Sequence, residues 1–240
     1  MKNEIKKVKY ETYLTDKTHL HIQNGNRKTG KGIYLVNLLP GDQPLTKKDG
    51  TQLTNIPGTC GGCCDCCKSD CYAIRYTMFH NYTVIRSYAD NTVLAREDID
   101  TFFKELQLFI DRSMISCIRF HAAGEIPSFE YLCRMADIAK ANPRIIFYTY
   151  TKRYSWLEEY LEKSLFPQNL VINVSIWHNN YDNPAGFPEF IYDDGTDDSL
   201  KDIKHCPAVN KDGHETGETC AHCKMCMYAK KGSKIAVYAH

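Results

Sequence analysis

The chain has 240 residues, of which 25% are charged, and its formal net charge is +1. This length supports one hydrophobic core, and the composition is that of a globular protein. The near-zero net charge argues against a protein that binds nucleic acid or an anionic membrane through charge. The first residues lack the apolar run of a signal peptide, and no later stretch is apolar enough to span a membrane. We therefore expect a cytoplasmic protein with no membrane partner.

The first motif in chain order is the glycine-rich segment 25–32, in which Gly25 and Gly30-Lys31 have the spacing of a phosphate-binding loop. Gly32 stands where such a loop needs Ser or Thr, and the segment precedes a predicted strand instead of following one. We therefore interpret the segment as a tight turn with basic side chains.

Strands and helices are expected to alternate along the chain. Hydrophobic and β-branched runs predict strands at 33–39, 115–121, 144–150 and 170–177. Helical spacing predicts helices at 72–85, 96–112, 128–141 and 154–165, and Asn, Asp, Gly and Pro indicate a surface loop at 178–205. This order predicts an α/β fold with a parallel sheet of about four to six strands, resembling a partial (βα) barrel.

The chain is expected to have one main domain and one short cysteine-rich segment. The partial βα barrel domain is predicted at 1–205, where it carries the cysteine-rich loop at 60–71. The C-terminal cysteine-rich segment is predicted at 206–240.

Cysteine is frequent, with 12 residues. The N-terminal set is Cys60, Cys63, Cys64, Cys66, Cys67 and Cys71, and the C-terminal set is Cys206, Cys220, Cys223 and Cys226. Cytoplasmic thiols are kept reduced, so such clustering predicts metal ligands rather than disulfides. Cys117 and Cys133 stand apart and are expected to be small buried hydrophobic residues.

The C-terminal set has a ferredoxin-like spacing. Cys220, Cys223 and Cys226 follow one another at two-residue gaps, and Cys206 is followed by proline. Four converging thiolates are what a four-iron cluster requires. Structural zinc usually takes two separated Cys-x-x-Cys pairs, so the spacing favours iron–sulfur over zinc.

The N-terminal set leaves several ligand sets open. Cys60, Cys64 and Cys67 have the Cys-x3-Cys-x2-Cys spacing that leaves one iron of a four-iron cluster open to a small molecule. Cys60, Cys63 and Cys66 with Cys71 make an equally good closed set. The surplus sulfurs could instead serve a larger or additional cluster.

A resemblance to the radical S-adenosylmethionine superfamily rests on the segment 118–127. Its Ala123-Gly124-Glu125 resembles the Gly-Gly-Glu-Pro turn that these enzymes place after their second strand. With the Cys60, Cys64 and Cys67 set, the resemblance implies that Glu125 holds the methionine amino group. An aromatic residue usually precedes the last cysteine of that motif, where this chain has Cys66.

A second resemblance, to the phage gene product 88 family, covers most of the chain. It rests on a combination of short motifs: Gly25-Asn26-x-Lys28, Thr59-Cys60, Cys71-Tyr72-Ala73, Phe120-His121-x-x-Gly124, the run 148–152, Cys206-Pro207 and the cysteines at 220, 223 and 226. Compared with the family pattern, Cys63, Cys64 and Cys66 are additional. The family implies no assigned activity, and a phage origin would place the protein in the cytoplasm of a bacterial host.

Four residues outside the cysteine sets are candidate cofactor-binding residues. Gly124 and Glu125 follow a predicted strand, and the carboxyl end of a barrel strand is the usual location of an active site. A helix N-terminal charge is the competing interpretation of Glu125. His121 and Lys152 end neighbouring predicted strands and could face the same opening.

Three functions are compatible with these patterns. We favour an iron–sulfur protein on a radical-enzyme-like scaffold, which holds two or more clusters for redox, storage or transfer and meets an unknown small molecule or redox partner. The second is a radical S-adenosylmethionine enzyme with an auxiliary cluster. The third is a zinc-stabilised interaction module, against which the neutral charge counts.

Overall fold

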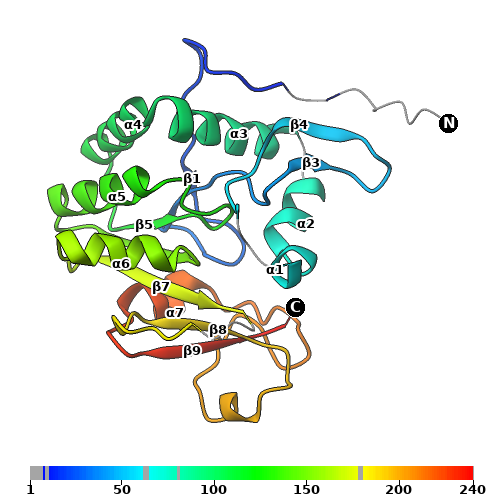
Figure 1. The fold of residues 1–240 in the computed structure, drawn as a ribbon, viewed down its shortest axis with the longest axis vertical. Helices are drawn as coiled ribbons and strands as arrows, with labels where there is room; N and C mark the ends of the chain where they lie inside the picture. The colour runs from blue at the N-terminus through cyan, green and yellow to red at the C-terminus, as the bar shows by residue number, and fades with distance from the viewer. Residues whose placement is uncertain (1–7, 9–10, 62–64, 80–81, 178–180, 240) are drawn as a thin grey trace. The chain divides into compact units, whose positions relative to one another are not determined.

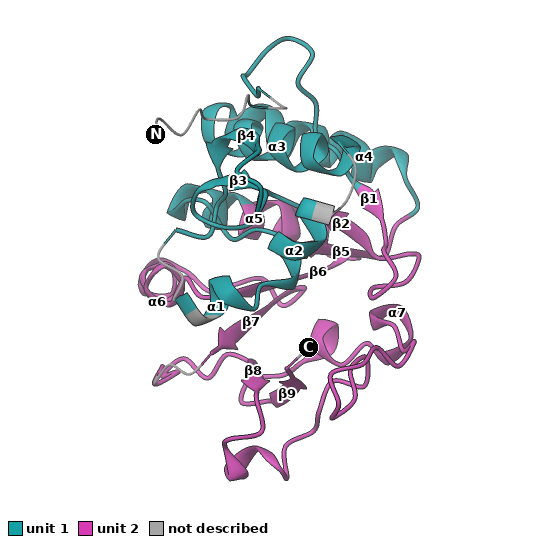
Figure 2. Ribbon diagram, turned by 90° about the vertical axis from the view of Figure 1, so that its right-hand side faces the viewer, with its two compact units in different colours: residues 1–22, 36–114, 121–134 teal, residues 23–35, 115–120, 135–240 magenta. Residues whose placement is uncertain are grey.

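The computed structural model describes residues 8, 11–61, 65–79, 82–177 and 181–239 and has an α/β fold (Figure 1). The chain forms two compact units that interleave in sequence, and each is described by itself (Figure 2). Unit 1 comprises residues 1–22, 36–114 and 121–134, and unit 2 comprises residues 23–35, 115–120 and 135–240. None of the helices in the described ranges has the length and apolar character needed to cross a membrane.

A mostly parallel sheet is the main element of unit 2. In the described residues its strand order is β1-β2-β5-β6-β7-β8-β9. The strands are β1 (Gln23–Asn24), β2 (Tyr34–Val36), β5 (Cys117–Phe120), β6 (Ile146–Thr151), β7 (Leu170–Ile176), β8 (Glu189–Asp193) and β9 (Lys234–Tyr238). β1 pairs antiparallel with β2, whereas the pairs from β5 to β9 are all parallel. The predicted α/β class and parallel sheet are therefore confirmed.

The two faces of this sheet differ in character. Alternation along β6 puts Phe147 and Thr149 on one face and Tyr148 and Tyr150 on the other. The parallel register pairs Arg119 of β5 with Tyr148, so the second face carries polar and aromatic groups. The short helix η2 (Cys226–Tyr228) packs against β6 and β7.

All four predicted strands are found, and one predicted loop is wrong. The strands expected at 33–39, 115–121, 144–150 and 170–177 correspond to β2, β5, β6 and β7. The loop expected at 178–205 instead contains β8, which pairs with β7 and β9. The turn-forming residues on both sides of β8 made this five-residue strand look like part of a loop. Its stability comes from pairing with the neighbouring strands of the sheet.

Among the described residues of unit 2, the helices are α6 (Tyr154–Lys163) and the much shorter η1 (Asp198–Leu200), α7 (Cys220–Cys223) and η2. The helix α5 (Phe129–Ala141) begins in unit 1 and ends in unit 2. The predicted helices 128–141 and 154–165 correspond to α5 and α6.

Unit 1 consists of helices and a two-stranded hairpin. The helices are α1 (Asp65–Ser69), α2 (Tyr72–Phe79), α3 (Tyr82–Glu97) and α4 (Ile99–Arg112), and β3 (Pro44–Thr46) pairs antiparallel with β4 (Gln52–Pro57). The helix predicted at 72–85 is thus α2 and the first turn of α3. Asp98 separates α3 from α4 because its side chain accepts a hydrogen bond from the Thr101 N–H and caps α4. A buried cluster that includes Leu39, Leu45, Leu53, Ile85 and Tyr88 joins these elements.

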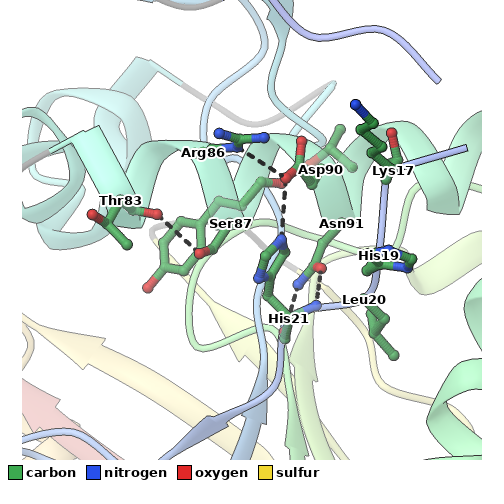
Figure 3. A network of polar contacts seen from close by, with 12 residues as sticks. Lys17, His19, Leu20, His21, Thr83, Arg86, Ser87, Asp90 and Asn91 are labelled. Carbon is green, nitrogen blue, oxygen red and sulfur yellow. Dashed lines mark hydrogen bonds and ion pairs between the residues drawn. The ribbon is translucent and has the colours of Figure 1, made fainter. Parts of the chain in front are cut away.

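Asn91 on α3 anchors the segment that precedes β1 (Figure 3). Its Oδ1 accepts a hydrogen bond of 2.7 Å from the His21 N–H, and its Nδ2 donates to the His21 carbonyl at 2.9 Å. The same Nδ2 donates to the Asn37 carbonyl at 2.9 Å. Because Asn91 is only 1% exposed, water cannot readily replace these bonds.

We expect Asn91→Ala to lower the free energy of unfolding by about 2–3 kcal/mol, since it leaves a buried carbonyl without its donor. Denaturant titration followed by circular dichroism measures this change. Ser87→Ala is the matched control on the same helix, because its hydroxyl donates to the Thr83 carbonyl on the exposed face. The control should change stability by less than about 0.5 kcal/mol. An equal loss in both variants would show that the Asn91 amide does not anchor the segment.

Candidate functional site

The N-terminal cysteine segment begins at a fixed point of unit 1. The Thr59 N–H donates to the Leu39 carbonyl at 2.9 Å, and the Cys60 N–H donates to the Gly41 carbonyl at 2.9 Å. Thr59 is 2% exposed. The backbone that carries the first cysteine is therefore held on the chain that follows β2.

The cysteines of this segment are described in part. Cys60, Cys67 and Cys71 are half-buried. Cys63 and Cys64 lie outside the described residues, and the side chain of Cys66 is likewise not described. Each of the two candidate ligand sets therefore includes residues that are not described: Cys64 in one set, and Cys63 and Cys66 in the other.

The turn predicted to bind a cofactor lies directly against the start of the cysteine segment. Thr59 Oγ1 accepts a hydrogen bond of 2.8 Å from the Glu125 N–H and donates one of 3.2 Å to the Leu39 carbonyl. One hydroxyl therefore joins the Glu125 turn to the residue before Cys60. This proximity spans 66 residues of sequence.

Two further side chains hold the same turn. Asn37 Oδ1 accepts from the Ala123 N–H at 3.1 Å, and the Tyr72 hydroxyl donates to the Ala122 carbonyl at 2.5 Å. The Ala123 carbonyl accepts from the Leu38 N–H at 3.0 Å. Backbone groups on both sides of Gly124 are thus bonded, and such support restricts the positions that the turn can take.

Gly124 is required by the backbone at this turn. Its φ is +87°, in the region that favours glycine. A Cβ at this position would lie 2.8 Å from the Leu38 Cβ and 2.9 Å from Thr59 Oγ1. The turn therefore lies so close to Leu38 and Thr59 that there is no room for a side chain at position 124.

His121 precedes the turn in a strained conformation. Its φ is +58°, which is uncommon for a residue other than glycine, and the side chain is 4% exposed. The His121 N–H donates to the Val36 carbonyl at 2.9 Å, and Nε2 lies 3.2 Å from the Tyr131 hydroxyl. Strain of this kind concentrates at functional sites, which keeps His121 among the candidate residues.

Tyr88, which bonds to Asn37, has two further tyrosines near its hydroxyl. Burial raises the pKa of Tyr88, and the nearby hydroxyls of Tyr76 and Tyr72 raise it further. Tyr88 accepts a hydrogen bond of 3.1 Å from Asn37 Nδ2. Tyr88 is therefore a neutral group that orients Asn37, and through it the Ala123 amide.

The Glu125 carboxylate is oriented by its own turn. Glu125 Oε1 accepts a hydrogen bond of 2.8 Å from the Ile126 N–H, and the residue is half-buried. The arrangement presents a partly exposed anion beside the cysteine segment.

Lys152, the fourth predicted cofactor-binding residue, belongs to unit 2. Its Nζ donates to Ser175 Oγ at 3.1 Å and lies 5.2 Å from the centre of the Trp177 ring. The prediction that His121 and Lys152 face one opening stays a prediction, since each is described within its own unit.

The predicted metal site at the C-terminal cysteines is wrong. Cys206, Cys220, Cys223 and Cys226 are all described as free thiols. Among the residues that the structure covers, no group of three or more His, Cys, Asp or Glu side chains could hold a metal ion. Naming the chain an iron–sulfur, four-iron or metal-binding protein on the basis of these four cysteines therefore fails.

The physical reason is that matching spacing does not by itself give metal-ligand geometry, even though these thiols lie within electrostatic range of one another. Cys220 and Cys223 lie in α7, whereas Cys226 begins η2, which packs against β6 and β7. Burial raises the pKa of the Cys226 thiol to about 12, although a hydrogen bond with Tyr150 opposes this shift. Burial also raises the pKa of Cys206. Both thiols are accordingly neutral at pH 7.

The fold and this site define an α/β protein in which a cysteine segment and a Gly-Glu turn meet within one unit. A family model described as Gene product 88 matches residues 20–227, and the chain belongs to this family. No significant similarity was found to any curated protein or to any solved structure.

Three residues of the site were not predicted from the sequence as site residues. Asn37, Thr59 and Tyr72 hold the turn through hydrogen bonds that span 86, 66 and 50 residues, respectively. Thr59 and Tyr72 flank the cysteine segment directly, and this adjacency was the available signal. Asn37, a polar residue inside an apolar predicted strand, was a weaker one.

Proposed function

We propose that the N-terminal cysteine segment binds an iron–sulfur cluster, which the protein holds for electron or cluster transfer. The observation that carries this proposal is the Thr59 hydroxyl, which joins the start of the segment to the Glu125 turn. Half-buried thiols on an anchored loop suit a cluster, because protein around the sulfurs limits solvent access. The absence of a metal-ion group among described residues does not bear on these ligand sets, which include Cys63 or Cys64.

The cluster would take its thiolates from Cys60 and from residues of the segment 63–71. Cys60, Cys64 and Cys67 would leave one iron open, whereas Cys60, Cys63, Cys66 and Cys71 would close the cluster. A larger cluster could use the surplus sulfurs. Gly61 and Gly62 suit either arrangement, since glycine permits a tight path of the chain.

A second candidate is a radical S-adenosylmethionine enzyme, and the Gly124-Glu125 turn favours it. A carboxylate held beside the cysteine segment suits the amino group of that cofactor, as the resemblance of the turn implies. This function would require the Cys60, Cys64 and Cys67 set and a scaffold of the partial-barrel type. If the protein has this function, Glu125→Gln should weaken binding of the cofactor and should retain the cluster.

The test is anaerobic purification of the full chain, with iron, sulfide and zinc analysis and electron paramagnetic resonance. We expect iron and sulfide in equal amounts, lost in Cys60→Ser and retained in Cys206→Ser. Cys206 is the matched control, being another half-buried thiol outside the segment. A spectral change on adding S-adenosylmethionine would favour the second candidate. Zinc without sulfide, or no metal at all, would overturn both functions.

A further inference from the structure

The glycine-rich turn at 25–32 belongs to unit 2 and is held together by hydrogen bonds within the turn. Asn26 Oδ1 accepts hydrogen bonds from the N–H groups of Lys28 and Thr29 at 2.9 and 2.8 Å. The Gly30 N–H donates to the Asn26 carbonyl at 2.9 Å. Gly25 has a φ of +67°, and a Cβ there would lie 1.9 Å from the Gly30 carbonyl oxygen. The expected tight turn is thus present, and it closes on itself.

Helix α7, which contains two of the C-terminal cysteines, is hydrogen-bonded to this turn. The Cys220 N–H donates to the Lys28 carbonyl at 3.0 Å, and the Ala221 N–H donates to the Thr29 carbonyl at 2.9 Å. At Gly30, a Cβ would lie 3.0 Å from the Ala221 Cβ. The helix is therefore fixed on the turn by two backbone hydrogen bonds and by close packing.

Cys220 and Cys223 are suitably placed for chemistry with each other. Both are free and half-buried, and they are three residues apart on a helical turn. Side chains at this spacing are neighbours, with Cβ atoms about 5–6 Å apart, so a small adjustment reaches disulfide geometry. Two partly accessible thiols at Cys-x-x-Cys spacing, in a protein with parallel β–α connections, are typical of a redox pair.

A positively charged side chain interacts with Cys220. The Lys28 ammonium lies within electrostatic range of the thiols of Cys220 and Cys206. Burial lowers the pKa of Lys28, while Glu215 and these thiols oppose that shift. A nearby cation and partial exposure are the features that make a cysteine reactive.

We propose that Cys220 and Cys223 form a reversible dithiol–disulfide pair that exchanges electrons with a thiol or disulfide partner. The Cys220 thiolate attacks one sulfur of the partner's disulfide, and the first partner thiolate leaves. The Cys223 thiolate then attacks the Cys220 sulfur, which forms the intramolecular bond and releases the second partner thiolate. Two electrons pass to the partner, and the two protons lost by the cysteines protonate the two thiolates that leave.

This pair is independent of the proposed cluster, which lies in unit 1. Lys28 acts as a positioning residue, because its ammonium lies within electrostatic range of the attacking sulfur. Lys28→Met is therefore expected to slow oxidation about three- to tenfold, and Lys28→Arg, which keeps the positive charge, is expected to retain the rate. A purely structural role of Lys28 would not be rescued by the charge alone.

The test uses the full chain, first analysed for bound metal and then treated with oxidised glutathione under argon. Free thiols are alkylated, and peptides are mapped by mass spectrometry. We expect a Cys220–Cys223 disulfide that dithiothreitol reverses and that Cys220→Ser or Cys223→Ser abolishes. Cys133→Ser, which removes a cysteine of α5, is the control and should leave the disulfide unchanged.

Three outcomes would overturn the proposal. One is alkylation of both thiols at every glutathione ratio, and another is oxidation that joins Cys220 or Cys223 to a different cysteine instead of to each other. The third is stoichiometric metal that protects the two thiols and is released by the same serine variants. Loss of the N-terminal cluster in Cys60→Ser would leave the disulfide intact, so failure of this proposal is distinguishable from failure of the proposed function.

Discussion

Gly124→Ala is expected to lower the free energy of unfolding of unit 1 by about 2–5 kcal/mol. A non-glycine residue at a φ of +87° costs about 1–2 kcal/mol, and forcing a methyl group into a packed site costs about 1–3 kcal/mol. The added Cβ would meet the Leu38 Cβ at 2.8 Å and the Leu38 carbonyl oxygen at 2.9 Å. Denaturant titration followed by circular dichroism measures the loss.

Gly50→Ala separates the two contributions to this loss. Gly50 lies between β3 and β4 with a φ of +80°, and a Cβ there meets nothing within 4 Å. Its replacement should therefore cost about 1–2 kcal/mol from the backbone conformation alone. If both variants lost the same stability, close approach of the Gly124 turn to Leu38 and Thr59 would play no part. In Gly124→Ala we also expect weaker iron retention, which Gly50→Ala should not show.

The elements that were predicted correctly are those with a strong local signal. Strand β6 is a run of β-branched and aromatic residues, and α4 has apolar residues such as Phe102, Leu106 and Ile110 at helical spacing. Strand β8 has only a three-residue signal of this kind, Phe190-Ile191-Tyr192, between turn-forming residues, and it becomes a strand through pairing with β7 and β9. Tertiary pairing of this kind cannot be deduced from a short window of sequence.

The candidate site was predictable where a motif carried it and not where contacts are distant in sequence. Gly124 and Glu125 stand out through a resemblance, and the structure places their turn against Thr59. Asn37 contributes through a bond to Ala123 that no periodicity indicates. The C-terminal cysteines illustrate the opposite error: their spacing matched a ferredoxin pattern, yet α7 and η2 distribute them over separate elements.

Asn37→Leu is expected to have the other large effect, a loss of about 3–5 kcal/mol in the stability of unit 1. Asn37 is 2% exposed and bonds through both ends of its amide, with Oδ1 accepting from the Ala123 N–H and Nδ2 donating to the Tyr88 hydroxyl. Leucine has a similar size but leaves the buried N–H and the buried hydroxyl without these bonds. The variant is measured by denaturant titration and by hydrogen exchange.

Tyr88→Phe removes the bond to Nδ2 while it leaves the bond to Ala123 in place. Its expected cost is about 1 kcal/mol, the usual net value of one hydrogen bond. Hydrogen exchange at the Ala123 and Glu125 amides should accelerate strongly in Asn37→Leu and little in Tyr88→Phe. This difference follows because the Oδ1 bond holds the turn directly, whereas Tyr88 acts through Asn37. Equal acceleration in the two variants would show instead that general loss of packing, and not the Asn37 amide, releases the turn beside Cys60.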